Sequence, residues 1–510
     1  MPTTPEEWLP LLTKKLDDRQ PRIATNRRYS RGDAPLPEMS RNLRASWEAF
    51  QKKSRTDMAG TLCESMAGRI VPRAVIVGEK ENDEVKAARK VWRNNRLDVV
   101  FGEAIYNALS VSIGYIILGT RNGQPIITSE EPEMVITQPD PAQPWRAIAA
   151  LKAWRDSDAE KDYAIVWANG LKQWFDRSLR TPEGGIRGES AGGWSVLADR
   201  LETYSGELPV YAVENEHGVA EFEPHIDVID RINLGKLQRL VVTAMQAYKQ
   251  RMLEGGLPKI DNEGHAINYD SMFEAAPGAL WDLPEGVKVV ELSGEDIRPL
   301  LEGEKTDLRD FAMVTRTPID VFIPDNQSAT GAENSQKGEI QKAKKRIARF
   351  GSPMEAAILG ALRVLGLDTE ETVHVQFEKP EHVGLSEKMA AAAQARTAGK
   401  SLRWIDKHIM GMTPEEIAQE ESDLAEEQLA AATLLGVAAQ TPITQNEPQT
   451  PTIDVEALKA KSDAMGVLIR SGATPESAAN EVGLTNIRFS GAVPVTLRVP
   501  EAKASSLEDK

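Results

Sequence analysis

The chain has 510 residues, of which 41% are hydrophobic and 27% charged, with one cysteine and a formal net charge of −16 at pH 7. This length allows about three or four domains at roughly 100–200 residues per domain, and the apolar fraction is too high for a disordered chain. A single cysteine excludes a disulfide framework and a cysteine-built zinc site, and the negative charge argues against a protein that coats DNA along its whole surface, because such binding neutralises phosphates with Lys and Arg.

The sequence predicts neither a membrane span nor a secretory signal. No run of about 18 apolar residues occurs, and the start, MPTTPEEWLPLLTKKLDD, is polar where a secretory signal is apolar. We therefore expect a protein that is made and kept in a cytoplasm-like compartment.

The N-terminal half of the chain is predicted to mix helices and strands. Its first 57 residues are locally basic and include a Pro-rich stretch at 33–40, which predicts an irregular arm. Apolar residues at helical spacing and β-prone runs follow. The predicted elements are helix over 40–70 ending at Val71-Pro72, a strand over 73–77, helices over 86–95 and 99–110, a β-hairpin that turns at 121–123, and a tryptophan-rich antiparallel β region over 147–213 interrupted by a Gly-rich loop at 181–194.

The C-terminal half is predicted to be mainly helical. A long helix over 226–254 is indicated by apolar residues at helical spacing, and a double glycine followed by Pro258 ends it. Thr413 and Thr474 precede prolines and are predicted helix N-caps. The other predicted elements are a small segment with a strand over 259–295, a helix over 304–315, a turn-rich loop over 323–334, a long helix over 336–365 with a possible break at Gly351-Ser352-Pro353, a strand over 372–377, and an Ala- and Glu-rich helical end from 385 with a linker at 440–452.

Motifs of known enzyme chemistry are not found. The six histidines are scattered, and none forms a pair at the spacing of a zinc site. The GKS at 399–401 lacks the first glycine of a phosphate-binding loop, because Gln394 stands there. Cys63 lies in a helical pattern and is predicted to be a buried structural thiol rather than a nucleophile. We therefore predict no catalytic residue, no metal and no cofactor.

Clusters of charge leave alternatives open. Asp227 with Asp230, and Asp307 with Asp310, have a spacing that a two-metal nuclease could use, but solvated helix faces are the favoured interpretation in a chain with 77 carboxylates. A basic stretch over 336–350 is weighed evenly between a solvated helix face and a contact with phosphate or an acidic neighbouring subunit. Its basic residues are Lys337, Lys342, Lys344, Lys345, Arg346 and Arg349.

The order of these elements resembles the portal proteins of tailed bacteriophages, of the siphophage type and similar to those of phages infecting actinobacteria. The stretches that carry the resemblance are NNRLDVVFGEAIYNALSVSIGYIILG before a strand pair, HIDVIDRINLGKLQRLVVTAMQAY, TPIDVFIPDNQSATGAENSQKGEIQKAKKRIARFGSPMEAAI, LSEKMAAAAQARTAGKSLRW with MGMTPEEI, and GLTNIRFSGAVPVTLR. It covers residues 40–495 and leaves the N-terminal arm and the Gly-rich loop near Gly184 unmatched.

The resemblance implies an α+β, portal-like fold. Its parts are a mixed α/β wing, a two-helix stem, a small α/β clip, a long wing helix and an α-helical crown. On this chain, residues 1–224 with 335–384 would form the wing, 225–255 and 297–316 the stem helices, 256–296 the clip, 317–334 the tunnel loop, and 385–510 the crown and C-terminal tail.

The function that the resemblance implies is structural and not enzymatic. Portals are rings of about twelve subunits at one capsid vertex, where they form the channel for packaging and ejection of double-stranded DNA. The implied partners are the terminase large subunit and then the head–tail adaptor at the clip, and the major capsid protein and a scaffold at the wing. The implied location is the virion, after assembly in the host cytoplasm, with no membrane partner.

Two sets of residues are candidates for contacts in that picture. Asn326, Gln327, Ser328, Thr330 and Asn334 are small polar residues of the tunnel loop that could touch DNA without a fixed charge; the alternative is an ordinary solvated turn. Phe273 and Trp281 are either core residues of the clip or anchors for the adaptor and the motor. The alternative functions are another virion ring or capsid-associated structural protein, and a metal-dependent nucleic-acid-processing enzyme.

Overall fold

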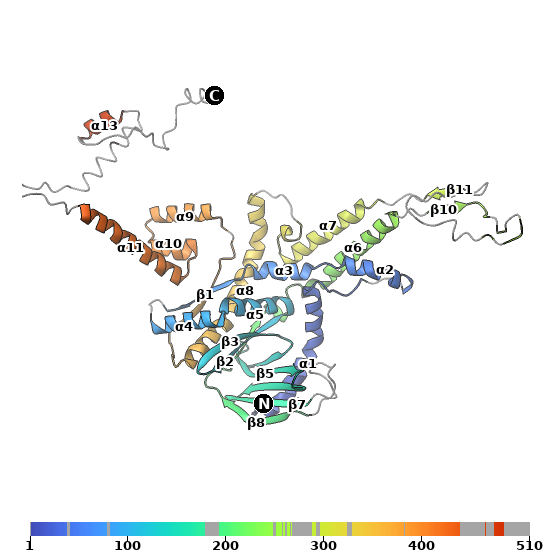
Figure 1. The fold of residues 1–510 in the computed structure, drawn as a ribbon, viewed down its shortest axis with the longest axis horizontal. Helices are drawn as coiled ribbons and strands as arrows, with labels where there is room; N and C mark the ends of the chain where they lie inside the picture. The colour runs from blue at the N-terminus through green and yellow to red at the C-terminus, as the bar shows by residue number, and fades with distance from the viewer. Residues whose placement is uncertain are drawn as a thin grey trace, which may run out of the picture. The chain divides into compact units, whose positions relative to one another are not determined.

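The protein is described here from a computed structural model, which divides the chain into two compact units, Met1–Asp423 and Leu424–Lys510. The first unit mixes helices with antiparallel sheets (Figure 1), so the α+β class expected from the sequence is confirmed. The structure describes residues 2–37, 41–78, 82–178, 193–247, 251–257, 259–260, 263–265, 267, 288–291, 296–323, 329–381, 383–438, 465 and 474–483.

The N-terminal segment is a long helix, so the prediction of an irregular arm is wrong for residues 5–30. Helix α1 (Pro5–Ser30) begins at Thr4, whose hydroxyl accepts a hydrogen bond from the Glu7 backbone N–H. Proline at positions 10 and 21 inside the helix obscured the pattern, since proline usually ends a helix. The helix is retained because its apolar side, including Leu12 and Leu16, is buried against a sheet.

The predicted strand over 73–77 and the two helices after it are confirmed, whereas the helix predicted over 40–70 consists of two helices with a break at residues 55–57. Phe101 and Leu109 lie fully buried in the largest hydrophobic cluster of the unit. The elements are α2 (Arg41–Ser54), α3 (Met58–Ala67), β1 (Pro72–Val77), α4 (Asp83–Asn95) and α5 (Leu97–Val111).

The predicted hairpin belongs to a three-stranded sheet of order β3-β2-β9. Asn122 and Gly123 both have positive φ, which a two-residue turn between twisted strands requires. At Gly114 a Cβ atom would come within 2.1 Å of the Ala104 carbonyl oxygen, so only glycine lets this strand approach α5 so closely. The strands are β2 (Ile113–Arg121), β3 (Gln124–Glu130) and β9 (Val210–Glu214).

The tryptophan-rich region is antiparallel β structure, as predicted, and forms a five-stranded sheet of order β4-β5-β6-β7-β8, but its last predicted strand, β9, belongs to the three-stranded sheet instead. One face packs on α1 through Leu151, Val166 and Phe175, while Trp167 of the other face packs on the three-stranded sheet. The strands are β4 (Val135–Pro139), β5 (Ala147–Asp156), β6 (Lys161–Ala168), β7 (Leu171–Ser178) and β8 (Ser195–Thr203).

The helix predicted over 226–254 is shorter than expected. Helix α6 (Ile226–Ala247) is followed by strand β10 (Arg251–Glu254), which pairs antiparallel with β11 (Lys288–Glu291). Apolar residues at 252 and 253 fit either a helix or a strand, and the partner strand lies more than 30 residues further along the chain. Helix α7 (Arg298–Thr315) then runs beside α6 (Figure 1) and ends two residues before Thr317-Pro318, as predicted.

Helix α8 (Ala329–Val364) is continuous, so the break considered at Gly351-Ser352-Pro353 does not occur. Pro353 has no backbone N–H and so removes one helical hydrogen bond. The helix continues because Phe350 and Met354 on either side of it are fully buried in the core. The predicted strand β12 (Val373–Phe377) pairs antiparallel with β1, which joins residues about 300 positions apart.

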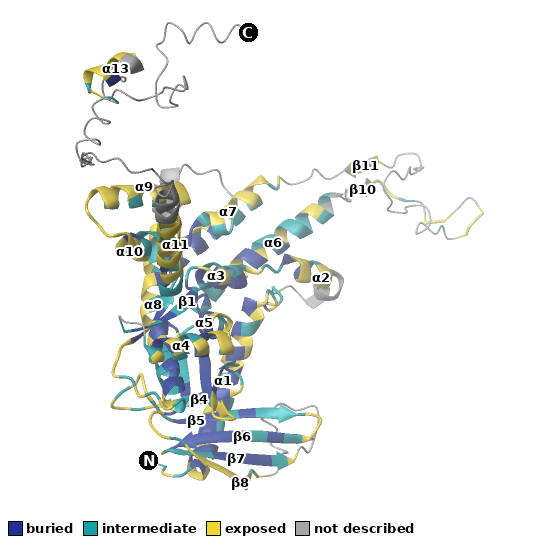
Figure 2. Cartoon of the chain, turned by 60° about the vertical axis from the view of Figure 1, so that its left-hand side comes forward, coloured by how far each residue is buried: buried dark blue, intermediate teal, exposed yellow. Residues whose placement is uncertain are grey.

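Residues 385–438 are mainly helical, as predicted, and α9 and α10 are largely exposed (Figure 2); the predicted linker at 440–452 lies outside the described residues. Glu416 N–H donates to the Thr413 hydroxyl, and the Ser477 N–H donates to the Thr474 hydroxyl, so both predicted N-caps are confirmed. The helices are α9 (Leu385–Thr397), α10 (Leu402–Ile405) with a π-turn (Asp406–Met410), α11 (Pro414–Ala438) and, in the second unit, α13 (Pro475–Glu481).

Candidate functional site

Helices α6 and α7 form an antiparallel pair joined by ion pairs. Arg231 Nε of α6 lies 2.9 Å from Asp307 of α7, and its Nη2 lies 3.1 Å from Asp310. About two turns further along, Arg239 Nε lies 3.0 Å from Glu304. Because the partner in α7 falls in number as the residue in α6 rises, the two helices run in opposite directions. Asp307 and Asp310 are therefore ion-pair partners of an arginine.

The other acidic pair, Asp227 and Asp230, lies at the N-terminal end of α6. The Tyr29 hydroxyl donates a 2.8 Å hydrogen bond to Asp230, and burial raises the pKa of the Asp230 carboxyl despite that bond. Asp227 is exposed. Within the described ranges, no three or more His, Cys, Asp or Glu side chains gather in a way that could hold a metal ion.

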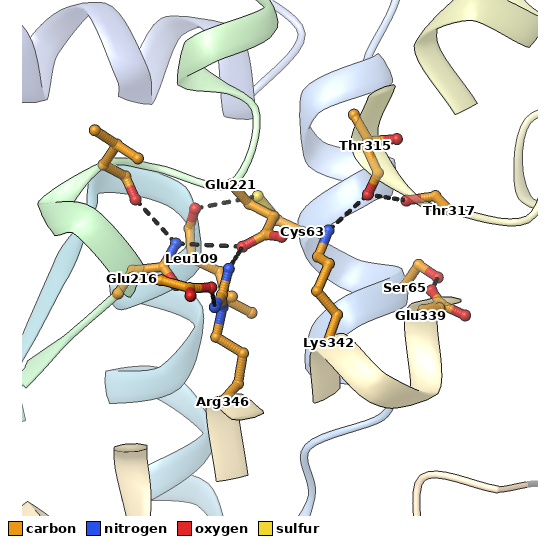
Figure 3. A network of polar contacts seen from close by, with 12 residues as sticks. Cys63, Ser65, Leu109, Glu216, Glu221, Thr315, Thr317, Glu339, Lys342 and Arg346 are labelled. Carbon is orange, nitrogen blue, oxygen red and sulfur yellow. Dashed lines mark hydrogen bonds and ion pairs between the residues drawn. The ribbon is translucent and has the colours of Figure 1, made fainter. Parts of the chain in front are cut away.

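One lysine holds the end of α7 from which the connection to α8 starts (Figure 3). Lys342 of α8 donates from Nζ to the Thr315 carbonyl, at the last turn of α7, over 2.7 Å. The same Nζ lies 2.5 Å from the Glu221 carboxylate, just before α6. Lys342 thus fixes the end of α7 to the body of the unit, while Thr317 and Pro318 beyond it are buried.

Glu221 is the centre of a buried charge cluster. Only 2% of its side chain is exposed, and Arg346 Nη2 lies 3.2 Å from its carboxylate. Arg346 also pairs with Glu216, and Asn215 donates to Glu221 over 3.2 Å. Burial disfavours the charged carboxylate, but Lys342 and Arg346 outweigh this cost and hold the pKa of Glu221 below its usual value.

A second buried carboxylate ties α8 to α3. The Glu339 side chain is 1% exposed, accepts a 2.6 Å hydrogen bond from the Ser65 hydroxyl and lies 3.2 Å from Arg69 Nη2. Glu339 and Lys342 are one helical turn apart, so one side of α8 is bound by α3, by the end of α7 and by the segment before α6. We call Glu221, Glu339, Lys342 and Arg346 the α8 anchor (Figure 3).

The predicted basic stretch is mostly engaged inside the unit. Lys342 and Arg346 belong to the α8 anchor, and Lys344 Nζ lies 2.5 Å from Glu381. Arg349 Nε donates to the Glu214 carbonyl over 2.8 Å. Lys337 and Lys345 are exposed. The acidic partners are Glu214, Glu216 and Glu221, before α6, and Glu381, after α8, and no local pattern in the sequence pairs these distant segments with the basic stretch.

The structure describes only some of the remaining candidate residues. Thr330 and Asn334, predicted in a loop, lie in the first turns of α8. Asn326, Gln327 and Ser328, and the clip residues Phe273 and Trp281, lie outside the described residues.

Cys63 is a buried structural thiol, as predicted. Its side chain is fully buried, and its Sγ lies 3.6 Å from the Leu109 carbonyl oxygen of α5 (Figure 3). Burial raises the pKa of this thiol well above its usual value, which keeps it uncharged and unreactive at neutral pH.

None of the helices in the described part of the chain combines the length and apolar character that a membrane crossing requires.

Solved structures of phage-like particles are similar to this chain at 12% identity. The neck of a native gene transfer agent (GTA) particle computed with C12 symmetry has a TM-score of 0.40 and covers 77% of this chain and 99% of that one. The virion of a native GTA particle has a TM-score of 0.38 and covers the same shares of the two chains. The neck of an empty GTA particle computed with C6 symmetry has a TM-score of 0.39 and covers 71% of this chain and 89% of that one. A search of curated proteins found no match.

Family membership follows from the sequence itself. A family model described as phage portal protein, SPP1 Gp6-like, matches residues 11–433, which is most of the chain. The match spans α6, α7, α8 and the α8 anchor. The chain therefore belongs to the family of SPP1 Gp6-like phage portal proteins.

Proposed function

We propose that the chain is the portal subunit of a phage or phage-like particle. In this role, identical copies form a ring at one capsid vertex, through which double-stranded DNA is packaged and later ejected. The observation that carries the proposal is the family match over residues 11–433. Copies that meet through two different surfaces close into a ring when the rotation between them closes. The protein acts as an assembly part and hydrolyses nothing itself.

The elements of the first unit suit this role. Helices α6 and α7 would be the stem lining the channel, and the cross-helix ion pairs of Arg231 and Arg239 keep that pair together. Residues 317–334 would be the tunnel loop, and Lys342 of the α8 anchor holds the end of α7 that precedes it. The remaining parts are proposed as wing (1–224 with 335–384), stem (225–255 and 297–316), clip (256–296), and crown with tail (385–510).

The charge distribution also suits a channel through which a duplex must slide. Each Lys or Arg contact with phosphate adds a salt-dependent grip that slows passage. In the basic stretch of α8, Lys342, Lys344, Arg346 and Arg349 are paired with carboxylates or carbonyls of the same unit. Small polar groups such as Gln327 and Ser328 would then be the tunnel-loop contacts with DNA.

The proposed partners follow from the assembly pathway of a portal. The terminase large subunit would dock on the clip, where Phe273 and Trp281 are candidate contacts, and a head–tail adaptor would replace it. The wing would contact the major capsid protein and a scaffold. These partners act at the portal vertex of the virion.

Electron microscopy with native mass determination on the purified protein tests the proposal. We expect a closed ring of about twelve subunits with a central hole. If only monomers are seen, the measurement is repeated with the capsid and scaffold proteins, which can be needed for closure. A compact dimer or tetramer without a channel would contradict the proposed function.

A further inference from the structure

A single tryptophan projects from the five-stranded sheet. Trp145 is 78% exposed, the highest fraction of any large apolar side chain in the described part of the chain. It lies in the loop between β4 and β5. A lone exposed apolar residue needs no explanation, but a nearly bare indole is costly, because a buried aromatic side chain removes 150–250 Å² from water.

The loop that carries Trp145 is held in one conformation. The Asp140 N–H donates to the Arg146 carbonyl over 2.8 Å, and the Arg146 N–H donates to the Gln143 carbonyl over 2.8 Å. Arg146 Nη2 also lies 2.7 Å from Glu207, and prolines at 139, 141 and 144 restrict the backbone. A preordered loop loses little conformational entropy on binding, which favours Trp145 as a binding anchor.

The same unit has an open hollow of about 610 Å³ beside α1. It is lined by apolar and polar residues together: Leu9, Pro10, Thr13, Lys14, Asp17, Asp18 and Trp194. The guanidinium of Arg177 stacks on the Trp194 ring at 4.5 Å and fixes that wall. The hollow is large enough for one indole, which would lie against its apolar side at Leu9, Pro10 and Trp194. The exposed Asp18 suits the Arg146 guanidinium that follows Trp145, which has N–H groups besides the Nη2 that pairs with Glu207.

Trp145 and the hollow lie at opposite corners of the sheet. Four strand spacings separate β4 from β8, or about 19 Å. The pairing register gives the separation along the strands. Ser195, next to Trp194, lies opposite Asp176, which lies opposite Tyr163, which lies opposite Trp154. Trp154 is seven residues from Ala147, the end of β5 next to the Trp145 loop. That is about 24 Å along the strands, so the diagonal is about 30 Å. The loop of one subunit therefore cannot fill its own hollow.

We propose that Trp145 of one subunit inserts into the α1–Trp194 hollow of the next copy of this chain. A projection and a complementary hollow at different sites on one molecule make a head-to-tail contact, which is the kind that closes a ring. The contact rests on the proposed function, because it specifies one of the surfaces through which the ring forms.

Chemical cross-linking tests this contact directly. Cys63, the one cysteine of the sequence, is fully buried, so the variant pair Ala142→Cys and Thr13→Cys adds two accessible thiols, and it keeps the indole because Ala142 is an exposed residue of the Trp145 loop. A short bismaleimide should convert rings of this double variant into a ladder of covalent dimers, trimers and higher species. Each single variant, and Ala142→Cys combined with Glu387→Cys on exposed α9, should give no ladder.

A second variant set measures the contribution of the indole. Trp145→Ala should raise the protein concentration at which rings dissociate at least about ten-fold, as loss of a tryptophan anchor does, and Trp145→Phe should recover part of the loss. Leu385→Ala, which truncates a side chain that is 70% exposed on α9, is the matched control and should leave dissociation unchanged.

The outcomes separate this inference from the proposed function. Rings that form normally but give no ladder, although both thiols react with a maleimide dye, overturn the inference and leave the portal assignment intact. A chain that stays monomeric and gives no ladder also overturns the inference, and the portal assignment is then judged by assembly with the capsid protein. A ladder with a ten-fold weaker Trp145→Ala ring supports both.

Discussion

The α8 anchor makes a quantitative prediction. Replacing Glu221 by Gln keeps the side-chain shape and removes the charge that faces two buried cations, Lys342 (12% exposed) and Arg346 (8% exposed). Removing one partner of a buried ion pair typically costs about 3–5 kcal/mol. Because Lys342 keeps the Thr315 carbonyl and Arg346 keeps Glu216, we expect the low end, about 3 kcal/mol of unfolding free energy.

Urea denaturation followed by tryptophan fluorescence is a suitable measurement. All ten tryptophans lie in the first unit, so the signal reports the unfolding of that unit. The matched control is Lys344→Met, which breaks the ion pair with Glu381 at a position where 57% of the lysine side chain is exposed. Exposed pairs contribute about 0–1 kcal/mol, so the control should change stability little.

A double-mutant cycle checks the reasoning. Lys342→Met alone leaves Glu221 with one cation fewer, and the double variant Glu221→Gln with Lys342→Met removes both charges of the 2.5 Å pair. The double variant should therefore lose at least about 1 kcal/mol less than the sum of the two single variants. Additive losses, or a Glu221→Gln loss no larger than that of Lys344→Met, would refute the description of the anchor as a coupled buried cluster.

Three further predictions follow from other features. Lys342 and Arg346 lower the pKa of Glu221, so the stabilisation from that carboxylate should be fully present above its ordinary pKa of 4.5 and be lost as the pH falls below it, which urea midpoints between pH 3 and 7 would measure. Leu12→Ala should lower the unfolding free energy by about 2–5 kcal/mol because Leu12 is fully buried, whereas Leu11→Ala, with 45% exposure, should change it by less than about 0.5 kcal/mol; equal effects would contradict the placement of α1. Deleting residues 327–331 should leave ring assembly intact but impair DNA packaging or retention, and loss of the ring would instead assign the loop to the subunit interface.

Elements with strong local signals were predicted correctly from the sequence. Two adjacent residues that tolerate positive φ placed the turn at Asn122-Gly123, and a threonine before a proline placed the starts of helices at Thr413 and Thr474. The family resemblance was also found from the order of such elements, and the family match confirms it.

Elements whose form depends on distant partners were predicted less well. Helix α1 contains two prolines and is retained because Leu12 and Leu16 are buried against strands more than 100 residues away. Strand β10 exists because β11 pairs with it, although its residues also continue the helical pattern of α6. In both places the free energy of a long-range contact outweighs a local preference.

The sequence by itself determined the class of the protein: composition and motifs excluded a disulfide scaffold and a cysteine-built zinc site, and element order indicated a portal. Only the tertiary structure showed that the cations of α8 are largely occupied within the unit. Lys342 and Arg346 look like a free basic face when the helix is considered alone, because their acidic partner Glu221 lies more than 100 residues earlier in the chain. Long-range pairing, which no local pattern encodes, turns that face into an anchor.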